Sequence, residues 1–144
     1  MKFNSQICTT REQSERLLAL GLKKETADMA YLWYGRAEDD TMLFLDKPSE
    51  VYQGIMTTHD IPAWSLHRLI EMMPNNIHKY NDIADLSVSN ELVQYRFYDV
   101  DYNHDVCLEH FNDGTLYNNI IDCIEWLIKE GYFNKKHLNG TTED

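Results

Sequence analysis

The segment between Pro62 and Pro74 carries apolar residues at the spacing of one short amphipathic helix. At about 100° per residue, five apolar side chains share one face: Ala63, Leu66, Leu69, Ile70 and Met73. Pro62 suits the first turn of a helix, where an N–H has no intrahelical partner, and Asp60 just upstream is a suitable cap. Pro74 disfavours helix at the residue before it. The pattern therefore predicts a central helix, starting at Pro62, that docks on a sheet.

The N-terminal region carries helix signals at both ends of a short apolar stretch. Thr10 and Gln13 have the spacing of a capping box. Gly21 suits the left-handed position after a helix, with Leu22 packing back on Leu17. Residues 23–30 are expected to form a second short helix directly afterwards.

The clearest helix is predicted between Thr115, a good N-cap, and Gly131, a good C-terminal stop. Six residues make a broad apolar stripe between them: Leu116, Ile120, Cys123, Ile124, Leu127 and Ile128. The polar residues from about 134 onward are expected to be a frayed tail.

The residue patterns of the stretches between these helices predict strands. Residues 31–34 and 41–45 predict a hairpin, and residues 51–56 a short edge segment. Residues 85–89, 91–98 and 105–111 predict a meander after a polar linker. In the middle run, Val93, Tyr95 and Phe97 alternate with Gln94 and Arg96, as in a half-buried strand. The sequence thus predicts a single α+β domain over residues 1–144, in which an N-terminal helix pair, a central short helix and a C-terminal helix pack on antiparallel strands.

The chain is acidic, with 24 Asp and Glu against 13 Lys and Arg and a formal net charge of −11. This balance argues against direct binding to nucleic acid or an anionic membrane, and it leaves open a basic protein partner or plain solubility. No segment approaches the roughly 18 uninterrupted apolar residues of a membrane span. Cys8, Cys107 and Cys123 are odd in number and widely spaced, which favours reduced thiols. The N-terminus lacks the apolar run of a signal peptide, so a cytoplasmic location is expected.

The run Asp99-x-Asp101-x-Asn103-x-Asp105 imitates the start of a calcium loop. His104 replaces the glycine that the sharp turn needs, and His110 replaces the bidentate Glu, so a solvated turn is the better interpretation. His104, Cys107 and His110 suggest zinc, but a strand would point Cys107 away from both histidines. We therefore predict no metal site and no cofactor.

Catalytic motifs are equally sparse. The sequence has no Gly-rich phosphate loop, no Gly-x-Ser-x-Gly and no His-Glu-x-x-His. Cys123 lies in the apolar stripe of the last helix, as a core residue would. His59 and Asp60 are an adjacent imidazole–carboxylate pair, and capping by Asp60 explains them without catalysis. No catalytic residue is assigned, and the balance is against an enzyme.

Two tryptophans fall outside the apolar stripes of their predicted helices. Trp64 lies near Arg68, and Trp126 near Asp122 and Lys129. A covering loop would explain Trp64, since large aromatics are mostly buried. An exposed Trp64 beside Arg68 would instead have the composition of a binding hot spot. The candidate binding residues are therefore Trp64, Arg68 and Trp126, with a protein as the expected partner and a homodimer left open.

Three motifs together resemble a family of small uncharacterised proteins from Bacteroides-type gut bacteria and their phages and mobile elements. They are Thr10-x-x-Gln13-x-x-x-Leu17-Leu18-x-Leu20-Gly21-Leu22-x-x-Glu25-Thr26-Ala27-Asp28-Met29, then Ile61-Pro62-Ala63-Trp64-Ser65-Leu66, and Trp126-Leu127-Ile128-x-x-Gly131-Tyr132. The resemblance implies a bacterial or mobile-element accessory protein, and it transfers no active site.

Three functions remain as hypotheses. The leading one is a non-enzymatic accessory protein that binds another protein. The second is an acidic mimic or immunity-type inhibitor, which would present carboxylates to a nucleic-acid enzyme in place of phosphates. The third is a small hydrolase or transferase that uses His59, Asp60 and His67.

Overall fold

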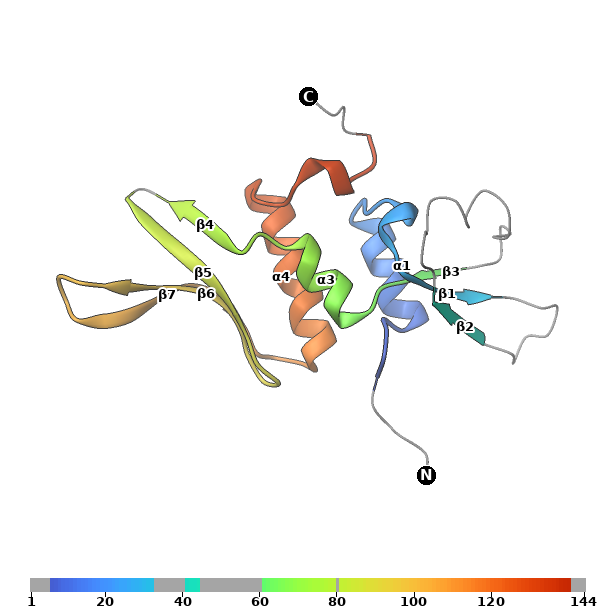
Figure 1. The fold of residues 1–144 in the computed structure, drawn as a ribbon, viewed down its shortest axis with the longest axis horizontal. Coiled ribbons are helices and arrows are strands. Elements are labelled where there is room, and N and C mark those ends of the chain that lie inside the picture. The colour runs from blue at the N-terminus through green and yellow to red at the C-terminus, as the bar shows by residue number, and fades with distance from the viewer. Residues whose placement is uncertain (1–5, 33–40, 45–60, 80, 141–144) are drawn as a thin grey trace. The chain divides into compact units, whose positions relative to one another are not determined.

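The computed structural model of the chain describes residues 6–32, 41–44, 61–79 and 81–140 (Figure 1). Helices and two antiparallel sheets occur together in these ranges, which confirms the predicted α+β class. The chain forms two compact units. Unit 1 comprises Met1–Ile70 and Lys135–Asp144, and unit 2 comprises Glu71–Asn134. The single domain over the whole chain stays a prediction.

Unit 1 opens with helix α1 (Arg11–Ala19), which begins at the predicted capping box. The Gln13 amide donates to the Thr10 hydroxyl over 3.1 Å, and the Thr10 amide donates to the Gln13 side chain over 3.0 Å. Each side chain thereby satisfies a backbone N–H that the helix itself leaves without a partner.

Helix α1 also ends as predicted. The amide of Leu22 donates to the carbonyl of Leu17 over 3.2 Å, and Gly21 has a φ of +103°, which is the Schellman arrangement. The second short helix is only partly present. A single 3₁₀ turn, η1 (Lys24–Thr26), is followed by strand β1 (Met29–Leu32) instead of further helix.

The sheet of unit 1 has the strand order β2-β1-β3, and both pairings are antiparallel. Pairing of β1 with β2 (Thr41–Phe44) confirms the predicted hairpin in its described part. The edge segment expected at residues 51–56 lies outside the described residues. The third strand, β3 (Ile61–Ala63), contacts α1, and the two elements lie together in Figure 1. A small core cluster joins Cys8, Met29 and Ala63, with Tyr31 packed against it.

The start of the central helix was predicted wrongly. Pro62 lies in β3, where it pairs with Ala30, and helix α3 (Leu66–Met72) begins one turn later. Among the described strands β3 is an outer one, and an outer strand tolerates a residue that cannot donate a hydrogen bond. Ser65 is the actual cap, because its hydroxyl accepts the amide of Arg68 over 3.2 Å.

The C-terminal segment of unit 1 differs from the frayed tail that the sequence predicts. Lys135–His137 forms a 3₁₀ turn, η2, and Leu138 makes an antiparallel bridge with Leu22. The amide of Lys23 donates to the carbonyl of His137 over 2.8 Å, and Asn139 donates to Gly21 over 2.7 Å. Backbone hydrogen bonds to the turn after α1 therefore hold the C-terminal segment, and the hydropathy of the sequence does not predict them.

Unit 2 contains the predicted meander. Its strand order is β4-β5-β6-β7, and every pairing is antiparallel. The bounds are β4 (Asn76–Lys79), β5 (Asp82–Val88), β6 (Val93–Asp99) and β7 (His104–Phe111). Strand β4 lies in the segment interpreted as a polar linker. It was missed because Ile77 is its single buried side chain, so its composition looks like that of a loop.

Helix α4 (Leu116–Glu130) confirms the predicted C-terminal helix. It begins at Thr115, whose hydroxyl accepts the amide of Asn118 over 3.3 Å, and ends at Gly131 with a φ of +81°. Helix α4 contacts β6 and β7 near one end of the sheet, and the β6–β7 turn extends beyond it (Figure 1). No helix in the described part of the chain has both the length and the apolar character to cross a membrane.

Candidate functional site

Trp64 is a core residue of unit 1 rather than an exposed anchor. Its exposed fraction is 0%, and its indole N–H donates to the hydroxyl of Thr26 over 3.0 Å. Its backbone amide and carbonyl both bind Thr9, at 3.1 and 2.9 Å. It lies between β3 and α3, so its predicted place on a helix face is wrong. The alternative in which Trp64 is covered is the one found.

Arg68 has a partner in the same unit. Its Nε donates to the carbonyl of Thr26 over 2.7 Å, and Thr26 also accepts from Trp64. Arg68 is half-buried. Its guanidinium therefore fixes helix α3 to the 3₁₀ turn η1.

Trp126, the third candidate, belongs to unit 2. It is half-buried, and its ring lies 5.7 to 6.2 Å from three other aromatic rings, those of Tyr95, Phe111 and Tyr132. Such spacing is typical of packed aromatic clusters. Trp126 therefore helps to hold α4 on its sheet. Its part in binding stays a prediction.

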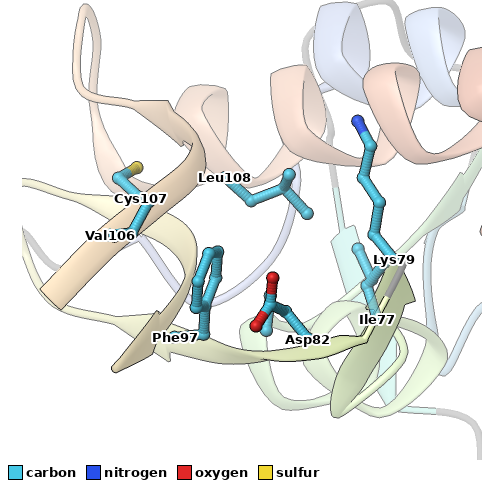
Figure 2. A pocket seen from close by; sticks show the side chains of 8 residues that line it. Ile77, Lys79, Asp82, Phe97, Val106, Cys107 and Leu108 are labelled. Atoms are coloured by element: carbon cyan, nitrogen blue, oxygen red, sulfur yellow. The ribbon is translucent and has the colours of Figure 1, made fainter. Parts of the chain in front are cut away.

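One hollow of unit 2 is a cleft on the sheet, with a volume of about 270 Å³. Five apolar side chains line it: Ile77, Ala84, Phe97, Val106 and Leu108. The Phe97 ring and the Leu108 side chain face this hollow, with the Asp82 carboxylate beside them (Figure 2). The cleft is thus apolar in its walls and open at one side.

The cleft lies where the buried apolar row of β6 reaches Phe97. Val93 and Tyr95 precede Phe97 on the same face of β6 and are fully buried, whereas Phe97 is only half-buried. Helix α4 packs on β6 and β7. The apolar row of β6 therefore continues into the cleft at Phe97.

Two charged side chains and one thiol complete the lining of the cleft. Lys79 and Asp82 stand opposite each other in the β4–β5 pair, and both line the cleft. Cys107 is also a lining residue and is exposed, while partial burial and the charge of Glu109 raise the pKa of its thiol. A raised pKa keeps the thiol protonated and a poor nucleophile near neutral pH.

The end of β6 and the turn that follows it present large apolar side chains to solvent. Tyr98 is 54% exposed, Val100 80% and Tyr102 76%. The carboxylate of Asp99 accepts the amides of Asp101 and Tyr102 at 3.0 and 3.3 Å, which shapes the turn. In the run that imitates the start of a calcium loop, Asp99 therefore binds backbone amides of the turn.

The remaining candidate chemistry divides between described and undescribed residues. Within the described ranges, no group of three or more His, Cys, Asp or Glu side chains could hold a metal ion. Cys123 is fully buried, and burial, followed by the charges of Glu109 and Asp122, raises its pKa to about 12. It is the core residue that the sequence predicts. His59 and Asp60 lie outside the described residues, so a site there stays a hypothesis.

Comparisons with protein-family models, with curated proteins and with solved structures find no match to this chain.

Sequence reasoning missed the cleft itself. Ile77 lies in the stretch interpreted as a linker, and Phe97 was recognised only as one member of an alternating row. One signal of a surface site was available in the sequence. The alternating apolar row of β6 ends at Phe97, and an acidic turn with aromatic residues follows it. The cleft also depends on which strands pair, and single-strand patterns do not give the strand order.

Proposed function

We propose that this chain is a non-enzymatic accessory protein that binds another protein through unit 2. The docking surface would comprise the cleft and the exposed turn between β6 and β7. The observation that carries the proposal is an apolar cleft within a strongly acidic unit.

Charge indicates the chemistry of the partner. Residues 71–134 contain twelve Asp and Glu and only three Lys and Arg, a net charge of −9, whereas the rest of the chain has a net charge of −2. An acidic surface attracts a basic partner and accelerates its association. The proposed ligand is therefore a segment with one large apolar side chain flanked by Lys and Arg.

The exposed turn adds apolar area to the proposed docking surface. Val100 and Tyr102 are the most exposed large apolar side chains of the described residues, and carboxylates flank them at Asp99 and Asp101. Aromatic side chains are enriched at the centre of protein interfaces, and polar groups are common at their rim. Such a turn would extend the contact beyond the cleft.

Selection from a random peptide library on the intact protein tests the proposal. Enriched peptides should share an apolar residue flanked by basic ones and bind more weakly as salt rises. Phe97→Ala should weaken them, and Val106→Trp should block the cleft. Gln94→Ala, on the opposite face of β6, is the matched control. No common motif, or equal binding to all four proteins, would refute the proposal.

A second candidate is the acidic mimic of nucleic acid, which the charge of unit 2 also favours. Its carboxylates are interrupted on the outer sheet face, where Arg96 stands opposite Asp85 and lies 3.5 Å from Asp105. Competition separates the two candidates. Duplex DNA should displace a mimic from a nucleic-acid enzyme, whereas it should not displace an apolar-anchored peptide from the cleft.

The proposed setting is the cytoplasm of a bacterium that carries the mobile element implied by the family resemblance. The three free cysteines, Cys8, Cys107 and Cys123, support a reducing compartment. Fractionation of the native host tests the location directly.

A further inference from the structure

The cleft of unit 2 carries a carboxylate among its apolar walls. Asp82 precedes the buried Ala84 on the same face of β5, because side chains alternate along a strand, and both residues line the cleft. The Asp82 carboxylate points into the hollow that the Phe97 ring and the Leu108 side chain also face (Figure 2). The cleft therefore combines an apolar surface with a negative charge at one point.

The Asp82 carboxylate is exposed, and it forms no ion pair with any residue that the structure describes. Lys79 stands opposite it in the β4–β5 pair, but the Lys79 side chain points away from the carboxylate (Figure 2). On the other face of the sheet, by contrast, Arg96 lies 3.5 Å from Asp105. The negative charge at the cleft is thus accessible to a ligand.

The cleft has a size that suits one large side chain. Its volume, about 270 Å³, lies below the range of about 300 to 1,000 Å³ that is usual for pockets of small organic ligands. Phe97, Val106 and Leu108 are half-buried in its walls. An apolar side chain that occupies the cleft would remove more of their surface from water, which favours binding.

A ligand that uses both features must carry a positive charge close to an apolar group. Lys and Arg carry their charge at the end of a long stem, on a residue that has no separate apolar side chain. The first residue of a polypeptide instead carries its α-ammonium group and its side chain on the same Cα. Capture of a free N-terminal amine is a recurrent mode of peptide recognition.

We propose that the cleft of unit 2 binds the free N-terminal residue of a partner protein. A large apolar first side chain packs on Phe97 and Leu108, and the α-ammonium group binds the carboxylate of Asp82. An aromatic first residue would gain further from contact with the Phe97 ring. This inference rests on the proposed function, since it uses the same docking surface, and it names the part of the partner that occupies the cleft.

Four synthetic peptides with a fluorophore at the C-terminus, titrated with the full chain, test the inference by fluorescence anisotropy. The first begins with Phe and carries two Lys residues further on. The second is its N-acetylated form, the third has the same composition with Phe in the interior, and the fourth has Ser in place of Phe. The first should bind most tightly. Acetylation, or movement of Phe to the interior, should weaken binding about fivefold, the upper value for an exposed ion pair.

Two substitutions separate this contact from the general attraction of a basic peptide to an acidic protein. Asp82→Asn removes the charge at the cleft, so acetylation of the first peptide should then make little difference. Asp85→Asn removes the same charge from the same strand, but Asp85 lies on the other face and lines a different hollow. Acetylation should weaken binding to this variant as much as binding to the parent chain. Such non-additivity is the sign of a direct contact.

The outcomes distinguish the inference from the proposed function. Equal binding of the free, acetylated and interior-Phe peptides would overturn the inference and leave the proposed function standing. An effect of acetylation that persists in Asp82→Asn would overturn the inference as well. If the Ser peptide binds as tightly as the first peptide, the apolar cleft selects nothing, and both fail. Asp82 is exposed, so Asp82→Asn should melt at the temperature of the parent chain. If it unfolds, the four peptides on the parent chain still decide.

Discussion

The indole N–H of Trp64 donates to the hydroxyl of Thr26 over 3.0 Å, so two residues 38 positions apart share a buried hydrogen bond. Both side chains are buried in unit 1. The tryptophan that suggests a binding surface in the sequence is therefore part of what holds β3 and α3 to the 3₁₀ turn η1.

Substitution of Trp64 should act on stability. Trp64→Phe removes the hydrogen bond and leaves Thr26 with one partner fewer, at about 1–2 kcal/mol, and Trp64→Ala should cost about 3–5 kcal/mol. Urea denaturation measures both. Thr26→Val, combined with Trp64→Phe, should be less destabilising than the sum of the two single changes. Strict additivity would contradict the buried pair.

Ser65, the cap of helix α3, should contribute to the stability of the protein. Its hydroxyl accepts the amide of Arg68 and donates to Asp28, and its own amide donates to Asp28 over 2.8 Å. Ser65→Ala should therefore lower the free energy of unfolding by about 1–2 kcal/mol. Ser89→Ala, in an exposed turn, is the control and should stay within about 0.5 kcal/mol. Equal effects would contradict the cap.

His137 should make the protein less stable in acid. Its pKa in the folded chain, about 4, lies below the ordinary value of 6.5, so the unfolded chain binds the proton more readily. The resulting stability is fully present above pH 6.5 and is lost as the pH falls towards 4. Denaturation at several pH values should show this loss, and His137→Gln should reduce it. A loss of the same size in His137→Gln would contradict this role of the imidazole.

The three cysteines should differ in their reaction with iodoacetamide. The pKa of all three thiols is raised, but Cys107 is exposed, whereas Cys8 and Cys123 are buried. The folded protein at pH 8 should therefore be alkylated first at Cys107, and the unfolded protein at all three. Peptide mass mapping gives the order. Early alkylation of Cys123 would contradict its place in the core of α4.

The sequence predicts those parts of the fold that local chemistry specifies. Thr10 and Gln13 cap α1, Gly21 ends it, and Thr115 and Gly131 bound α4, because caps and left-handed positions depend on few neighbouring residues. The alternation around Tyr95 in β6 is equally local.

The errors concern residues whose structure is decided by distant partners. Pro62 is compatible with a helix start and with an outer strand, and pairing with Ala30 decides between them. In the sequence, Ile77 is a single apolar residue among polar ones. Its pairing with Ala84 of β5 is what places it in a strand. The candidate cleft combines both difficulties, since its walls come from all four strands of the sheet of unit 2.

The bridge between Leu22 and Leu138 gives the chain an order of assembly. Unit 1 is interrupted by the whole of unit 2, so its two parts are separated by 64 residues along the chain. During synthesis the meander and α4 leave the ribosome before Leu138 does, and contacts distant in sequence form slowly. Unit 2, with its apolar cleft, can therefore fold before the bridge between Leu22 and Leu138 completes unit 1.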